Sequence, residues 1–299
     1  MKIYDCFQFF DEEMLLDLRL NIMDRYVDKF VITEASYMHN GSSKKLIFDI
    51  NKFKKFKDKI IYIVVDEQPP DLYSIFDKDT DEKDTRGQKL VLNGYKRDNY
   101  QRQMANKALS KIDSDDWIII NDIDEIPNLE NINFKIIKSK IILFKQKMFY
   151  YKFNLLYPST PWFGSKACKK KNFLSPQWLR NVRQKKYPIW RIDTLFSKKK
   201  YTDISIVNNG GWHFTNIKLP EDIHKKLLNY THHYEFESSG INLDRLKKIV
   251  KEKKIIYDHS QDQTGYKWGS EKTLSKVELS EMPIFLRENY KKYISWLDI

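Results

Sequence analysis

Residues 117–127, WIIINDIDEIP, decide the fold class of this 299-residue chain. The apolar run 117–120 predicts a buried central strand, and Asp122 and Asp124 follow it one residue apart. In open α/β sheets, ligands bind beyond the carboxyl ends of the strands. We therefore predict that this acidic turn lies at a ligand site; the alternative is an ordinary acidic turn at the surface.

The rest of the chain alternates between apolar strand patterns and helical patterns. We expect strands at residues 2–10, 30–33, 60–65, 117–120, 141–153 and 189–196. We expect helices from residue 11 onward and over residues 97–111, 220–230 and 244–253. Residues 77–89 are charged and almost free of apolar side chains, which predicts a mobile loop. The alternation predicts an α/β fold with a mostly parallel sheet, and the lack of repeats or a clear linker favours one domain over residues 1–299.

Composition limits the class of protein and its location. The chain has 53 Lys and Arg against 41 Asp and Glu, a net charge of +12, which suits an anionic ligand or nucleic acid but also a plain lysine-rich surface. Cys6 and Cys168 stand far apart, which excludes a disulfide framework and a cysteine-rich zinc site. The longest apolar run, residues 60–65, is too short to span a bilayer, and the N-terminus lacks a signal-peptide core. We expect a cytoplasmic protein that can sit at the inner membrane face.

The acidic turn has the chemistry of a divalent-cation site. Asp122 and Asp124 can both reach one Mg²⁺ or Mn²⁺ and leave coordination positions open for phosphate oxygens. His213, between two aromatic residues after paired glycines, could add a nitrogen ligand. The alternative for His213 is a packed, hydrogen-bonded side chain.

Three further positions suit a nucleotide. Arg97 and Arg102 could clamp a diphosphate in a forked geometry, and Tyr100 between them could stack on a base. The alternative is a solvated helix face. Tryptophans at 162, 178 and 190 could form a sugar-stacking wall or simply belong to the core.

Several motifs, in order along the chain, resemble glycosyltransferase family 17, the family of the β-1,4-mannosyl-glycoprotein β-1,4-N-acetylglucosaminyltransferase. They are YDCFQFF at 4–10, FVITEA at 30–35, NYQR at 99–102, NDIDEIP at 121–127, GWHF at 211–214 and HYEF at 233–236. The resemblance covers nearly the whole chain.

The resemblance implies a GT-A type fold, a Rossmann-like α/β sandwich with a D-x-D motif on the donor side. Residues 1–127 would form the half that binds the nucleotide sugar, and residues 128–299 the acceptor half with the C-terminal helices. It implies inverting transfer of a sugar from a UDP-sugar, UDP-GlcNAc above all, to a glycan or glycolipid, with Mn²⁺ or Mg²⁺ on Asp122 and Asp124.

Individual roles are expected for several residues. Glu34, at a strand end, is positioned to hydrogen-bond the base or ribose, as strand-end acids do in dinucleotide folds. Arg180 resembles a family position and would bind phosphate. Glu235 is the first candidate for the catalytic base and Asp193 the second, although a structural ion pair would explain either one. Two other classes of function stay open at this point: a basic nucleic-acid-binding protein, and a non-catalytic sugar-binding protein of the same fold.

Overall fold

The computed structural model describes residues 1–75, 83–184, 190, 197, 200, 203–230, 233–259 and 267–299. Its largest sheet contains β1 (Ile3–Phe9), β2 (Lys29–Ala35), β3 (Ile60–Val65), β4 (Trp117–Ile120), β6 (Ile141–Phe144), β9 (Lys166–Lys169) and β10 (Ile204–Val207). The spatial order is β10-β6-β9-β4-β1-β2-β3, and β9 runs antiparallel to both of its neighbours. The prediction of an α/β fold with a mostly parallel sheet is confirmed.

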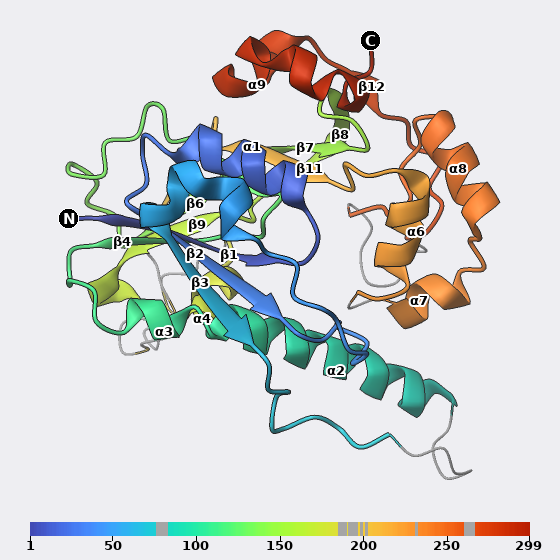
Figure 1. Ribbon diagram of the computed structural model, residues 1–299, viewed down its shortest axis with the longest axis horizontal. Helices are drawn as coiled ribbons and strands as arrows, with labels where there is room; N and C mark the ends of the chain where they lie inside the picture. Colours follow the sequence, from blue (N-terminus) through green and yellow to red (C-terminus); the bar gives the residue numbers. More distant parts are fainter. Residues whose placement is uncertain are drawn as a thin grey trace.

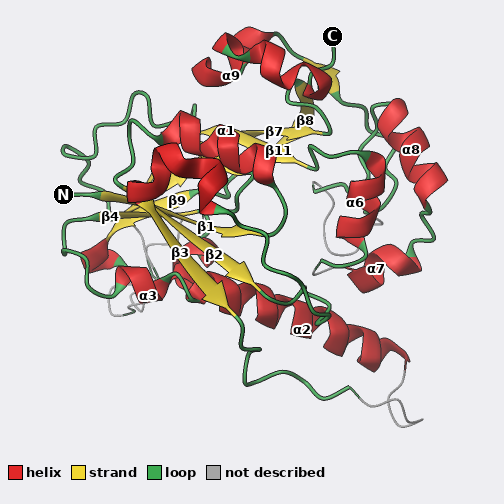
Figure 2. Ribbon diagram, in the orientation of Figure 1, coloured by secondary structure: helices red, strands yellow, loops and turns green. Residues whose placement is uncertain are grey.

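Helices cover both faces of this sheet. On one face lie α1 (Glu13–Met23) and a 3₁₀ segment (Ile50–Lys59); on the other lie α2 (Lys83–Gln103), α3 (Asn106–Leu109) and α4 (Pro176–Asn181) (Figures 1 and 2). The central strand β4 is therefore buried on both sides. Trp117 and Ile119 belong to the core beneath α1, and Ile118 belongs to the core beneath α3 and α4. An unbroken apolar run is typical of such a strand.

Three expectations about secondary structure differ from the structure. Residues 83–89 form the first turns of α2; their Lys, Arg and Gln residues have high helix propensities, although Asp84, Thr85 and Gly87 do not. The helix expected over 97–111 ends at Gln103, and α3 follows it separately. The pattern at 141–153 contains two strands that belong to different sheets. The strand expected at 189–196 lies almost wholly outside the described residues.

The second sheet begins directly after the acidic turn. It contains β5 (Glu125–Pro127), β7 (Gln146–Tyr150), β8 (Leu155–Trp162), β11 (Gly211–Thr215) and β12 (Ser275–Lys276), in the order β12-β8-β7-β11-β5. Because β4 and β5 are consecutive strands of different sheets, the chain passes from one sheet to the other at residues 121–124. This junction carries the D-x-D motif.

The C-terminal helices complete the structure. The second sheet packs against α6 (Pro220–Leu227) and α8 (Leu243–Lys251) through a hydrophobic cluster that also includes Phe236 of α7 (His233–Ser238). α9 (Ile284–Glu288) returns to contact α1 (Figure 1). Among the helices in the described part of the chain, none combines the length and apolar character that crossing a bilayer requires.

Candidate active site

A cavity of about 290 Å³ lies at the carboxyl ends of β1, β2 and β4. Asp122 and Asp124 enter it from the junction between the sheets, His213 enters from β11, and Arg102 enters from α2. Lys226 contributes to the lining from α6, which packs against the second sheet. The acidic turn therefore lines a cavity at the strand ends, and the sequence prediction that it binds a ligand stays a prediction.

A buried ion pair holds the junction in place from behind. Arg19 and Asp5 have no exposed surface, and the Arg19 Nε and Nη2 atoms donate to the Asp5 carboxylate at 2.8 and 2.6 Å. Nη1 of Arg19 donates to the carbonyl oxygens of Asp122 and Ile123 at 3.2 Å and of Glu125 at 2.7 Å. One guanidinium thus binds three carbonyl groups of the turn and fixes its course between the sheets.

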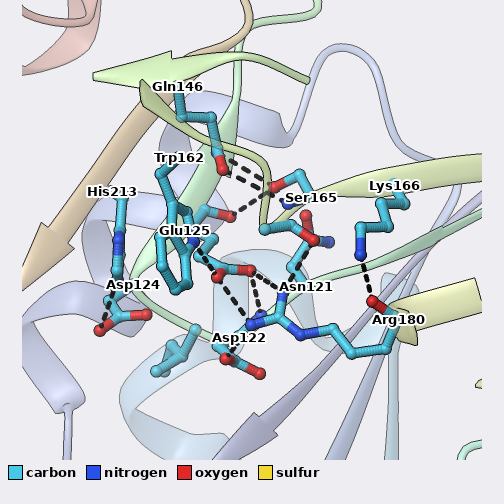
Figure 3. Close-up of polar contacts among 12 residues, drawn as sticks. Asn121, Asp122, Asp124, Glu125, Gln146, Trp162, Ser165, Lys166, Arg180 and His213 are labelled. Atoms are coloured by element: carbon cyan, nitrogen blue, oxygen red, sulfur yellow. Dashed lines mark hydrogen bonds and ion pairs between the residues drawn. The ribbon is translucent and has the colours of Figure 1, made fainter. Parts of the chain in front are cut away.

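The side chain of Asp122 is held by two arginines. Its Oδ1 lies 3.1 Å from Nη2 of Arg102, and its Oδ2 lies 2.6 Å from Nη2 of Arg180 (Figure 3 shows the Arg180 contact). Burial alone would raise the pKa of Asp122, but the charges of Arg180 and Arg102 outweigh it and lower the pKa below its ordinary value. Asp122 is therefore ionised at neutral pH, with both oxygens already engaged.

Glu125 is a site residue that the sequence analysis missed. This fully buried carboxylate accepts from Nη1 and Nη2 of Arg180 at 2.5 and 2.8 Å, from the indole N–H of Trp162 at 2.5 Å and from the backbone N–H of Asp122 at 2.9 Å (Figure 3). A Cβ atom at Gly164 would lie 1.9 Å from Glu125 Oε1, so this position requires glycine. The acidic residues around Glu125 pointed to this position in the sequence. Its side-chain partners Trp162 and Arg180, however, lie 37 and 55 residues further along the chain.

Asp124 and His213 face each other across the junction. Oδ2 of Asp124 lies 3.5 Å from Nε2 of His213, whose ring stacks on Trp162 at a centroid distance of 4.9 Å. Within the described residues, the buried Nδ1 of His213 has no hydrogen-bond partner. Burial alone would raise the pKa of Asp124, but His213 and then Lys226 outweigh it and lower the pKa. Asp124 is therefore an ionised carboxylate beside an imidazole.

This pair fits a divalent cation that also binds phosphate. Mg²⁺ sites commonly use one or two protein carboxylates and leave the other positions to water and phosphate oxygens, and carboxylate oxygens also suit Mn²⁺. Asp124 and His213 offer one oxygen and one nitrogen at close range, whereas Asp122 faces the two arginines. In the described ranges, no group of three or more His, Cys, Asp or Glu side chains is placed to hold a metal.

The three α2 residues predicted to bind the nucleotide occupy different places. Arg102 lines the cavity, and it also contacts Asp98 at 3.1 Å. Arg97 donates to the Gln68 side chain at 2.7 Å and to a backbone carbonyl at 3.1 Å. Tyr100 packs against a small cluster beside β2 and β3. Of the three, only Arg102 is among the described residues that line the cavity.

The carboxylate of Glu34, at the end of β2, binds other residues of the chain. Its carboxylate has no exposed surface and pairs with Lys44. It also accepts from the backbone N–H groups of Ile47 and Phe48 at 2.9 and 3.1 Å and from the Tyr62 hydroxyl at 2.8 Å. These contacts hold the segment after β2, and Glu34 is not among the described residues that line the cavity.

Of the two candidate bases, only Glu235 is a described residue, and it is not among the described residues that line the cavity. Glu235 lies on α7. Burial of Tyr95 and Tyr257 raises the pKa of both hydroxyls, and the negative charge of Glu235 is the next largest cause. Asp193 lies outside the described residues. Of the three tryptophans, Trp162 lines the cavity, Trp178 of α4 is partly buried against the core, and Trp190 is 78% exposed.

Comparison with known proteins identifies the family. None of the curated proteins matches the chain. The sequence model of glycosyltransferase family 17 matches residues 1–297, which is essentially the whole chain. This match agrees with the ordered motifs and with a cavity lined by the D-x-D carboxylates. The chain therefore belongs to glycosyltransferase family 17, and the protein is a glycosyltransferase.

Proposed function

We propose that this enzyme transfers a sugar with inversion from a UDP-sugar, UDP-GlcNAc above all, to a glycan or glycolipid acceptor in a Mn²⁺- or Mg²⁺-dependent reaction. The observation that carries the proposal is the meeting of Asp124 and His213 at the carboxyl ends of the parallel strands, inside the cavity. We propose further that the strand order and the helices on both faces represent a GT-A type, Rossmann-like fold.

The part of the cavity beside β1 and β2 suits a nucleoside. Phe9, Phe10 and Tyr37 line it, and aromatic side chains stack on bases of any sequence. The Tyr37 hydroxyl is buried and has no hydrogen-bond partner within the described ranges, so a small shift would let it bind a polar edge of the ligand. We infer that these aromatic residues, rather than Tyr100, flank the base.

Several residues of the chain hold the charged groups of the site in fixed positions before the transfer. Arg19 fixes the turn, and Arg102 and Arg180 hold Asp122 in one position, so the charges of the site need little rearrangement during the reaction. A metal ion held by Asp124 and His213 would supply positive charge beside the diphosphate. The acceptor hydroxyl gives its proton to a carboxylate base. Asp193 and Glu235 remain the candidates for this role.

We expect UDP with Mn²⁺ to raise the thermal midpoint of the protein. A ligand that binds only the native state adds about 2.7 kcal/mol at 100 times its Kd. GDP and CMP should stabilise much less, because a site that hydrogen-bonds uracil leaves polar groups unpaired with another base. A thermal-shift titration with the three nucleotides measures this. A larger shift of the thermal midpoint with GDP than with UDP would show that the proposed donor nucleotide is wrong.

We propose that the enzyme works in the cytoplasm, at the inner membrane face. The net charge of +12 supports contact with anionic lipids and with lipid-linked precursors. Cell fractionation should recover the protein from the cytoplasm and the inner face of the membrane. Recovery of the native protein from a secretory lumen would contradict this proposal.

A further inference from the structure

Lys226 brings a positive charge to the cavity from α6, which packs against the second sheet. It lies in the last turn of α6, the helix near the carboxyl ends of β1 and β2 (Figure 1), and its side chain is half-buried and lines the cavity. Burial alone would lower the pKa of its ammonium group, but the charges of Glu12 and Asp124 outweigh it and raise the pKa. The side chain is therefore charged at neutral pH and lies within electrostatic reach of Asp124.

Lys226 differs from Arg102 and Arg180 at the junction because its ammonium group is not paired with a described carboxylate. Arg102 pairs with Asp98 and Asp122, and Arg180 pairs with Asp122 and Glu125. Across the described ranges, Lys226 has neither an ion pair within 4.0 Å nor a side-chain hydrogen bond. An ammonium group enclosed by a cavity but left unpaired favours an anionic ligand there.

We propose that Lys226 binds the β-phosphate of the nucleotide donor and neutralises the charge that develops on it as the sugar leaves. The inference rests on the proposed function and deepens it. In the transfer, a bond forms between the acceptor oxygen and the anomeric carbon, and the bond from that carbon to the β-phosphate oxygen breaks. The electron pair of the broken bond stays on the phosphate oxygen, the acceptor proton goes to the base, and Lys226 donates a hydrogen bond without losing its proton.

The chain offers a matched control at the neighbouring position. Lys225 lies in the same helical turn but is exposed and is not among the described residues that line the cavity. Lys225→Met and Lys226→Met remove the same charge from the same helix end, so any effect through the helix dipole or the net charge is shared. A difference between the two variants therefore reports on the cavity.

The test compares UDP with UMP, because only UDP carries the second phosphate. With Mn²⁺ present, we expect Lys226→Met to weaken UDP binding about 10- to 100-fold and UMP binding less than twofold, since a hydrogen bond to a charged group is lost only with UDP. Lys225→Met should change neither by more than twofold. Retained UMP binding shows that the Lys226→Met site is still folded.

Kinetics provide the second measurement. Lys226→Met should lower kcat with UDP-GlcNAc at least about tenfold, and Lys226→Arg should restore part of the loss because it keeps the charge. Equal losses of UDP and UMP affinity, or no loss of either, would overturn the role of Lys226 while leaving the proposed function intact. Wild-type protein that binds no nucleoside diphosphate, with UDP and GDP both tried, would overturn the proposed function together with this inference.

Discussion

Asp124→Asn is expected to lower the rate of sugar transfer at least about 100-fold while changing the thermal midpoint little. The substitution keeps the shape of the side chain but removes the negative charge that faces His213 across 3.5 Å. Loss of a charged oxygen ligand weakens the hold on a divalent cation and on the diphosphate bound to it. Initial rates with UDP-GlcNAc at increasing Mn²⁺ concentrations measure the effect, and high Mn²⁺ should restore part of the activity.

Asp122→Asn is the matched control for the metal assignment. Both oxygens of Asp122 are engaged by Arg102 and Arg180, so this variant should lose stability and turnover without needing more Mn²⁺. If Asp122→Asn raised the Mn²⁺ requirement and Asp124→Asn did not, the metal ligand would be the other carboxylate. Activity that survives EDTA unchanged would remove the metal from the proposal altogether.

Arg19→Met is expected to lower the free energy of unfolding by about 3–5 kcal/mol, the usual cost of removing one partner from a buried ion pair. Among the described residues, the change leaves the fully buried Asp5 carboxylate with the Asn121 amide as its side-chain donor, at 2.6 Å. It also removes the donor from three carbonyl groups of the turn. Denaturant unfolding followed by circular dichroism measures the loss.

A double variant separates the two effects of Arg19. Arg19→Met with Asp5→Leu contains no uncompensated buried charge, so it should regain part of the stability lost by Arg19→Met alone. Its turnover should stay low, because the carbonyls of the turn remain without their donor. A loss below about 1 kcal/mol in Arg19→Met would show that the ion pair does not hold the junction.

The sequence predicts the fold well where an apolar pattern coincides with burial on both faces. The run 117–120 has one stable place in an α/β fold, the centre of the sheet, and the carboxylates that follow it must then lie at the strand ends. The start of α2 at Lys83 is harder to predict, because its first turns are charged. Such a segment suits a helix or a loop equally well until its neighbours are known.

Side-chain direction and distant partners limit what the sequence says about the site. Glu34 ends a strand, as predicted, but the segment after β2 supplies enough donors to satisfy its carboxylate. The joint binding of Asp122 and Glu125 by Arg180 depends on how α4 packs beside β9, which no local pattern specifies. Lys226 is one of many lysines in the sequence, and only its position on α6 separates it from Lys225.

The passage of the chain from one sheet to the other also governs where the protein can be divided. β5 and β11 are paired strands, and His213 lies opposite Glu125 in this pair. A cut after Pro127 would separate the two strands. A fragment of residues 128–299 would then present β11 as a bare edge strand, with unpaired N–H and C=O groups ready to join another chain. Expressed alone, the C-terminal part should therefore aggregate, and co-expression with residues 1–127 should restore its solubility by returning the missing strand.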